Sequence, residues 1–169
     1  MPTTTLQPVL AAIDVGTNAV RLELARPDAD GALETLHQER DPIRPGEGVF
    51  TTGRMPEETA DRLLSTLRRY AALCRRHKAR VRAVATSAMR DARNSQEIVQ
   101  RVREEAGLNL EVVSGKEEAR LICLGVLHRK PEHVRSLVVD IDGGSTEVAL
   151  ATGERPDDLW SLSCATARR

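Results

Sequence analysis

Two short segments of the sequence share a residue pattern that suits phosphate and cation chemistry. The first, AAIDVGTNAVRLELA, begins at Ala11, and the second, LVVDIDGGSTEVALA, begins at Leu137. Each contains an apolar run ending in Asp, a Gly-containing turn with Thr or Ser, and a second run. Gly lets backbone amides approach a phosphate, hydroxyls donate to its oxygens, and a carboxylate can hold a hydrated cation. Two such hairpins facing each other would clamp a phosphate chain and its metal ion.

Either turn alone also has a purely conformational explanation, because Asp, Gly and Asn are the residues that tight turns require. A second candidate group lies at the start of a predicted helix, where Ser114 and Glu117 have the spacing of a capping box. Glu118 has no capping role there, and its structural explanation is a favourable position in the first turn of the helix dipole.

The apolar pattern predicts the elements that position these groups. The order is three strands, a helix, a strand, a helix, a strand, a helix and a final hairpin. The predicted strands are two within residues 8–25, then 32–39, 81–85, 110–113, 137–141 and 147–151. Residues 41–55 read as a loop, and the helices run from Pro56 through Cys74, from 94 or 95 to Gly107, and from Ser114 through Leu127.

Composition excludes several classes of protein. The chain has 169 residues, with 25 Lys and Arg against 25 Asp and Glu, so its balanced charge gives no electrostatic reason to expect nucleic-acid or membrane-surface binding. No apolar stretch approaches about 18 residues, which excludes a spanning helix. The three cysteines lack metal-site or disulfide spacing, and residues 1–7 lack the pattern of a secretory leader. We therefore expect a reduced, cytoplasmic protein that binds neither nucleic acid nor a membrane.

Within this neutral chain, residues 62–82 hold nine basic side chains. One interpretation is a solvated helix face whose charges complement the C-terminal end of the helix dipole. The other is a track for a polyanion. The sequence leaves both open.

Four stretches together resemble one known family, the exopolyphosphatases and guanosine pentaphosphate phosphohydrolases (Ppx/GppA). They are AAIDVGTNAVRL, AVATSAMRDARN, VVSGKEEARL and LVVDIDGGSTEVAL, which follow in the family's order from Ala11 to about Leu150. The resemblance implies an α/β, actin-like fold of the sugar-kinase and heat-shock ATPase type, ribonuclease H-like, with a mixed sheet flanked by helices. It also implies hydrolysis of terminal phosphoanhydrides with Mg²⁺ or another divalent cation, the substrate being inorganic polyphosphate or pppGpp.

The resemblance also implies roles for residues of this chain. Glu118 would be the general base that activates water. Phosphate binding would fall to Gly16, Thr17, Asn18, Arg90, Gly143, Gly144, Ser145 and Thr146. The metal ligands would be Asp14, Asp140 and Glu147.

The chain departs from the family pattern in two places. The second turn normally reads D-I-G-G-G-S-T-E, whereas Asp142 stands here at the first of the three glycines, where its charge would repel a phosphate unless a cation bridges them. The chain also stops soon after the second hairpin. We therefore expect an actin-like first domain at residues 1–132 and a truncated start of a second domain at 133–169. The tail DDLWSLSCATARR is not expected to continue that domain.

These departures leave three functional hypotheses. The first is a phosphohydrolase, and the second is a catalytically impaired fragment that binds polyphosphate or a nucleotide without turnover. An ATP-dependent kinase is disfavoured, because S-G-x-E-E-A-R is no kinase motif. A hairpin without a sheet of its own would expose an apolar face, which must pack on the first domain, pair with another chain as in a homodimer, or be partly disordered.

Overall fold

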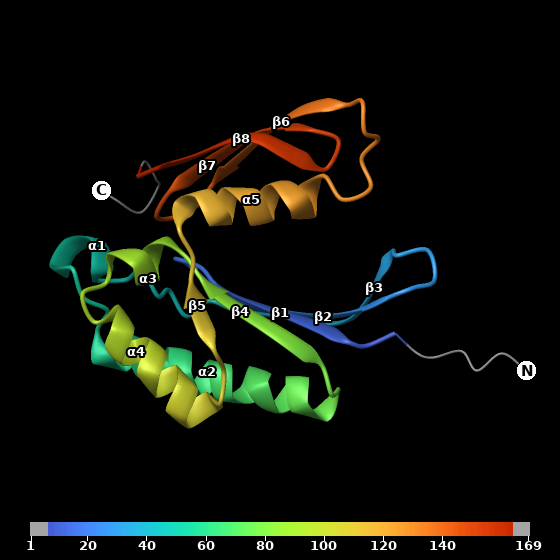
Figure 1. Cartoon of the computed structure of the whole chain (residues 1–169). Helices are drawn as coiled ribbons and strands as arrows, with labels where there is room; N and C mark the ends of the chain where they lie inside the picture. The colour runs from blue at the N-terminus through green and yellow to red at the C-terminus, as the bar shows by residue number, and fades with distance from the viewer. Residues whose placement is uncertain (1–6, 164–169) are drawn as a thin grey trace, which may run out of the picture.

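The computed structural model describes residues 7–163, which form alternating layers of helices and sheets (Figure 1). A five-stranded sheet has α2 and α4 on one face and α5 on the other, and a three-stranded sheet covers the far side of α5 (Figure 1). Residues 1–6 and 164–169 lie outside the described part, and they include Cys164 and all but the last of residues 1–7.

The five-stranded sheet has the order β3-β2-β1-β4-β5. Strands β1 (Leu10–Val15), β2 (Val20–Pro27) and β3 (Leu33–Asp41) are antiparallel neighbours. Strands β4 (Arg80–Ala85) and β5 (Leu110–Val112) run parallel to β1. The β1–β2 turn and the segment after β4 therefore lie at the same edge of the sheet, where ligands of open α/β sheets usually bind.

Apolar periodicity predicts the buried faces of α2 and β2 correctly, whereas Val126 and Val81, which it also places among buried residues, are exposed. Helix α2 (Glu57–Arg76) buries the six predicted positions Ala60, Leu63, Leu64, Leu67, Ala71 and Cys74. Strand β2 buries Val20, Leu22 and Leu24 against this helix face, while Arg21 is exposed on the other side. This packed layer fixes the edge of the sheet that carries the first hairpin turn.

Two short helices were not predicted. Helix α1 (Val49–Thr52) interrupts the predicted loop, and α3 (Ser87–Asp91) follows β4. The next predicted helix is present as α4 (Ser95–Arg101), which continues into a π-helical turn, η1 (Val102–Ala106), and ends at Gly107 with φ +68°. Within residues 7–163, no helix is long and apolar enough to cross a membrane.

The expectation of a second hairpin without a sheet of its own is wrong, because residues of the tail form a third strand. Strands β6 (Arg135–Ile141), β7 (Thr146–Thr152) and β8 (Arg155–Leu162) form one antiparallel sheet. Helix α5 (Gly115–Val126) packs on β7 and β8, where its Cys123 meets Ala149 and Ala151. The outer face still exposes apolar side chains, among them Leu137 at 63% and Ile141 at 65%. The domain boundary at residue 132 stays a prediction.

Candidate active site

A cavity of about 410 Å³ lies where the two hairpin turns and α5 meet. Its walls include six of the predicted site residues, namely Asp14, Gly16, Thr17, Asn18, Glu118 and Asp140. Asp142 also lines it. The remaining predicted residues, Arg90, Gly143, Gly144, Ser145, Thr146 and Glu147, lie outside this lining. We refer to this cavity as the cleft.

The first hairpin turn is held by backbone and side-chain hydrogen bonds. The amide of Gly16 donates to the carbonyl of Ala19 at 3.1 Å and closes the turn between β1 and β2. The hydroxyl of Thr17 is hydrogen-bonded to that of Ser87 on α3 at 2.8 Å. Thr17 is only 2% exposed, so in this conformation its hydroxyl serves to join the turn to α3. Its predicted role in binding phosphate stays a prediction.

The second hairpin turn presses directly on the first. A Cβ added to Gly143 would stand 2.7 Å from Nδ2 of Asn18, and one added to Gly144 would stand 2.0 Å from Oγ of Ser87. Both distances are shorter than any side-chain carbon tolerates. Gly143 is therefore needed for the close approach of the second hairpin to the first, and Gly144 for its close approach to α3, besides any predicted contact with phosphate.

Glu118 lies in the first turn of α5 and is only 7% exposed. Nη1 of Arg90 donates to Oε2 of Glu118 at 2.6 Å and to the carbonyl of Val113 at 3.1 Å, while Nη2 donates to Oγ of Ser145 at 3.4 Å. Burial raises the pKa of Glu118 to about 7; Arg90 opposes this rise, and the carboxylate of Glu147 adds to it. A carboxylate with a pKa near neutrality is suited to accept a proton from water.

The neighbouring Glu117 behaves differently, although its spacing to Ser114 predicts a capping box. Ser114 does cap α5, because its hydroxyl accepts a hydrogen bond from the amide of Glu117 at 3.2 Å. The Glu117 side chain instead accepts from Arg120 at 2.7 and 2.8 Å and from Arg82 at 3.2 Å. The hydrogen bonds from Arg120 and Arg82 lower the pKa of Glu117 to about 2. The hydrogen bond to the Ser114 side chain is therefore present as predicted, whereas the Glu117 side chain forms ion pairs instead of the predicted hydrogen bond back to the amide of Ser114.

Asp14 brings negative charge to the cleft. Burial raises its pKa, Arg21 at 3.5 Å opposes the rise, and the carboxylates of Asp142 and Asp140 add to it. If Gly16 carried a Cβ, Oδ2 of Asp14 and Oδ2 of Asp142 would lie 3.9 and 4.0 Å from it. The two carboxylates thus face the same turn, and their mutual repulsion would be relieved by a cation.

These carboxylates fit the way Mg²⁺ is commonly held, through one or two carboxylates together with substrate phosphates and water. Within residues 7–163, no three acidic, His or Cys side chains gather as a complete ligand set. Asp14 and Asp142 are the side chains best placed to hold a cation together with a phosphate chain. The set of Asp14, Asp140 and Glu147 stays a prediction, and Glu147 is not part of the cleft lining.

Glu147 is held by a residue that the sequence did not indicate. Its side chain is 2% exposed, and Oε1 accepts a hydrogen bond from Oγ of Ser161 on β8 at 2.8 Å. Oε2 has no hydrogen-bond partner among the described residues. Ser161 also packs on α5, because a Cβ on Gly115 would stand 2.1 Å from its Oγ. Only the pairing of β8 with β7, in which Ser161 faces Glu147, brings this serine to the site.

A pair of arginines was also missed. Arg21 on β2 and Arg40 on β3 are cross-strand partners, and both line the cleft. Like charges placed directly opposite each other destabilise a sheet. Arg21 has Asp14 nearby, whereas no carboxylate of residues 7–163 lies within ion-pair distance of Arg40. An anion in the cleft would neutralise both.

Comparisons with known proteins agree with this arrangement. The Ppx/GppA phosphatase family matches residues 25–168. A Ppx/GppA family member from Aquifex aeolicus is 33% identical, with a TM-score of 0.85 over 94% of this chain and 52% of that chain. An exopolyphosphatase from Cytophaga hutchinsonii is 32% identical, with a TM-score of 0.86 over 95% of this chain and 52% of that chain. The chain thus spans about half the length of these relatives.

A more distant likeness concerns the fold alone. The ethanolamine utilization protein EutJ from Carboxydothermus hydrogenoformans is 16% identical, with a TM-score of 0.51 over 94% of this chain and 53% of that chain. The predicted actin-like α/β fold, with its mixed sheet flanked by helices, is therefore confirmed. The family match over residues 25–168 and the 33% identity to the Aquifex aeolicus family member show that the chain belongs to the Ppx/GppA phosphatase family.

Proposed function

We propose that the protein acts in the release of terminal phosphate from inorganic polyphosphate. The observation that carries this proposal is the buried carboxylate of Glu118, which lines the cleft beside both hairpin turns and is held by Arg90. Membership of a phosphatase family supports the reaction class, and the exopolyphosphatase among the similar structures supports the substrate.

In the proposed reaction, water attacks the terminal phosphorus while Glu118 accepts its proton. The new O–P bond replaces the P–O bond to the next phosphate, so orthophosphate and a chain shorter by one unit leave. Arg21 and Arg40 would bind the chain by charge-assisted hydrogen bonds, and Gly16 and Asn18 would lie beside it in the first turn. A divalent cation beside Asp14 and Asp142 would neutralise charge on the phosphates.

We propose polyphosphate rather than pppGpp as the substrate, because no aromatic residue of the described chain lines the cleft. Among the described residues that form its walls there is no Phe, Tyr or Trp on which a guanine base could stack. Glycine, threonine, asparagine and arginine groups there suit phosphate oxygens instead.

Phosphate release from polyphosphate and from pppGpp, with Mg²⁺ present, tests the proposal. We expect wild-type turnover of polyphosphate and its loss in Glu118→Gln. The control is Glu117→Gln, which makes the same change one residue earlier at a side chain paired with Arg120. Equal rates in wild type and Glu118→Gln would remove Glu118 from the chemistry.

The second candidate is a module that binds polyphosphate without turnover. Asp142 favours it, since this carboxylate stands in the turn where the family pattern has glycine. Calorimetric titration with polyphosphate separates the two: binding with no phosphate release supports this module and overturns the hydrolase. Dimerisation and cytoplasmic location are not needed for either proposal.

A further inference from the structure

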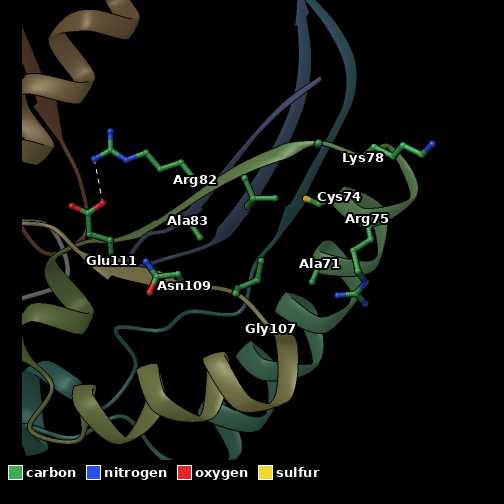
Figure 2. A pocket seen from close by; sticks show the side chains of 12 residues that line it. Ala71, Cys74, Arg75, Lys78, Arg82, Ala83, Gly107, Asn109 and Glu111 are labelled. Carbon is green, nitrogen blue, oxygen red and sulfur yellow. Dashed lines mark hydrogen bonds and ion pairs between the residues drawn. The ribbon is translucent and has the colours of Figure 1, made fainter. Parts of the chain in front are cut away.

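A second cavity, of about 630 Å³, lies near the beginning of β4, at the other end of this strand from α3 and the cleft (Figures 1 and 2). It shares no lining residue with the cleft. Its polar side chains come from the last turn of α2 and the residues just after it, from β4, and from β5 and the residue before it. They are Arg75, Lys78, Arg82, Asn109 and Glu111, and we call this group the basic notch.

The notch holds two of the cations of the basic segment that have no carboxylate partner among the described residues. Earlier in residues 62–82, Arg62, Arg68 and Arg69 form ion pairs with acidic side chains. No carboxylate of the described residues lies within ion-pair distance of Arg75 or Lys78. Arg82 is paired both with Glu111 at 3.3 Å (Figure 2) and with Glu117 at 3.2 Å. The lining holds three cations and one carboxylate, Glu111, and Glu117 outside the lining also pairs with Arg82, so the uncompensated charge lies on Arg75 and Lys78.

The helix dipole explains only part of this charge. Cations are favoured in the last turn of a helix, which accounts for Arg75 on α2. Lys78, however, lies beyond the end of α2 with φ +51°, a left-handed conformation in which glycine is preferred. Arg82 belongs to β4 and has no relation to the end of that helix. A bound anion would account for Arg75 and Lys78 together, whereas Arg82 is already balanced by Glu111 and Glu117.

The edge of the sheet adds hydrogen-bond donors. Strand β5 pairs only with Ala83–Ala85, so the first half of β4 has no strand on that side within the described chain. The amide of Arg80 donates to the carbonyl of Val9 on the other side. Because consecutive amides of a strand point in opposite directions, the amide of Val81 faces the notch. The side-chain amide of Asn109 lies there too.

We propose that the basic notch binds a linear oligophosphate. Its donors come from three segments, namely the end of α2 with the residues after it, the first half of β4, and the residue before β5, so an anion with several charged groups can contact more of them than a single compact ion can. From Val81 to Thr86 at the cleft, β4 spans roughly 16 Å. A long polyphosphate chain can therefore occupy the notch as a site additional to the cleft. Only the identity of the anion rests on the proposed function.

Lysine acetylation with and without long-chain polyphosphate tests this site in the full chain. The sequence has three lysines, Lys78, Lys116 and Lys130. Lys116 lies in the first turn of α5 near the cleft, and Lys130 lies in a separate cavity with Glu132 and Glu154. We expect polyphosphate to protect Lys78 and to leave Lys130 reactive. Protection of Lys116 without protection of Lys78 would overturn the proposal that the basic notch binds polyphosphate. Equal protection of Lys78 and Lys130 would overturn it too.

Affinity measured by calorimetry gives a second test. Removing two partly exposed cations in Arg75→Ala with Lys78→Ala should weaken polyphosphate binding about tenfold. The matched control is Arg76→Ala with Arg80→Ala, which removes the same charge from the same segment at positions outside the notch lining. Equal losses in both double variants would overturn the proposal. Tighter binding of polyglutamate than of polyphosphate would show that the notch is a site for acidic peptides instead.

These outcomes are independent of catalysis. A wild-type chain that releases no phosphate but shows protection of Lys78 would overturn the proposed hydrolysis and leave the notch standing. A chain that hydrolyses polyphosphate with Lys78 unprotected would do the reverse.

Discussion

Arg90 and Glu118 form a 2.6 Å ion pair that joins α3 to α5 beside the cleft. The sequence resemblance implies that Arg90 binds phosphate, whereas its guanidinium here contacts Glu118, the carbonyl of Val113 and the hydroxyl of Ser145. Arg90 thus positions the proposed base and links it to the second hairpin. Any phosphate contact by Arg90 would have to share the guanidinium with Glu118.

The first prediction concerns the pH dependence of phosphate release. A general base acts when deprotonated, so with the pKa of Glu118 at about 7 the rate should rise with pH and level off above that value. Arg90→Met removes the positive charge that favours the carboxylate, which should raise the pKa of Glu118 by about one to three units. The rising limb should therefore move to higher pH.

The control for this profile is Arg120→Met, which removes an arginine paired with Glu117. It should leave the rising limb where the wild type has it. A limb that stays in place in Arg90→Met would show that a group other than Glu118 titrates in the rate.

The second prediction concerns Arg40. Arg40 stands opposite Arg21 in the sheet and lines the cleft. Arg40→Ala should therefore weaken polyphosphate binding about tenfold or more, because a hydrogen bond to a charged group contributes a free energy of that size. Thermal stability should stay the same or rise slightly, since the cross-strand repulsion is relieved. Calorimetry and a melting curve measure the two effects. Arg103→Ala, an exposed arginine on η1, is the control and should change neither.

The sequence predicts the elements whose signal is local. The alternating residues of β2 and the 3.6-residue period of α2 predict their buried faces correctly. Helix α3 has five residues, too few for a period to be visible, and β8 contains Pro156, Asp157 and Asp158, which disfavour strands. Pairing with β7 forms β8 in spite of that composition. Such long-range pairing is not visible in a local pattern.

The same reason separates the predicted from the missed residues of the site. Asp14, Gly16 and Glu118 belong to contiguous motifs, so their place in the cleft followed from the sequence. Ser161 and Arg40 enter the site only through their strand partners, Glu147 and Arg21. Their functional relevance depends on register, which one sequence without its sheet does not reveal.

The third prediction concerns Asp142. Its backbone does not have a positive φ, so glycine is not required there for conformation, and charge is the main consequence of the carboxylate. Asp142→Asn should strengthen polyphosphate binding at low Mg²⁺ and make binding less dependent on Mg²⁺. Titrations over a range of Mg²⁺ concentrations measure this. If Asp142→Gly strengthens binding and Asp142→Asn does not, crowding rather than charge is the cause.

The fourth prediction concerns the hydrogen bond from Ser161 to Glu147. Ser161→Ala leaves both carboxylate oxygens of a buried side chain without a partner among the described residues, which should lower the free energy of unfolding by about 1–3 kcal/mol. Urea denaturation measures this loss. Ser163→Ala, at an exposed position two residues later, should be neutral. Equal midpoints for the two variants would show that Ser161 does not support Glu147.

The last prediction concerns the contact of Gly144, in the second hairpin, with Ser87 on α3. In Gly144→Ala the new Cβ would stand 2.0 Å from Oγ and 2.7 Å from Cβ of Ser87, so the second hairpin must move away from α3. That movement should lengthen the 3.4 Å contact between Arg90 and Ser145. We expect a clear fall in the rate of phosphate release and only a small change in the free energy of unfolding. Gly125→Ala is the matched control, because a Cβ there meets open space on α5 and alanine favours a helix. Since both atoms of the Ser87 side chain obstruct the new methyl group, Ser87→Gly in the Gly144→Ala background should restore part of the rate, and Ser87→Ala should restore less. A Gly144→Ala variant with wild-type rates would show that the close approach of the second hairpin to α3 is not needed for turnover.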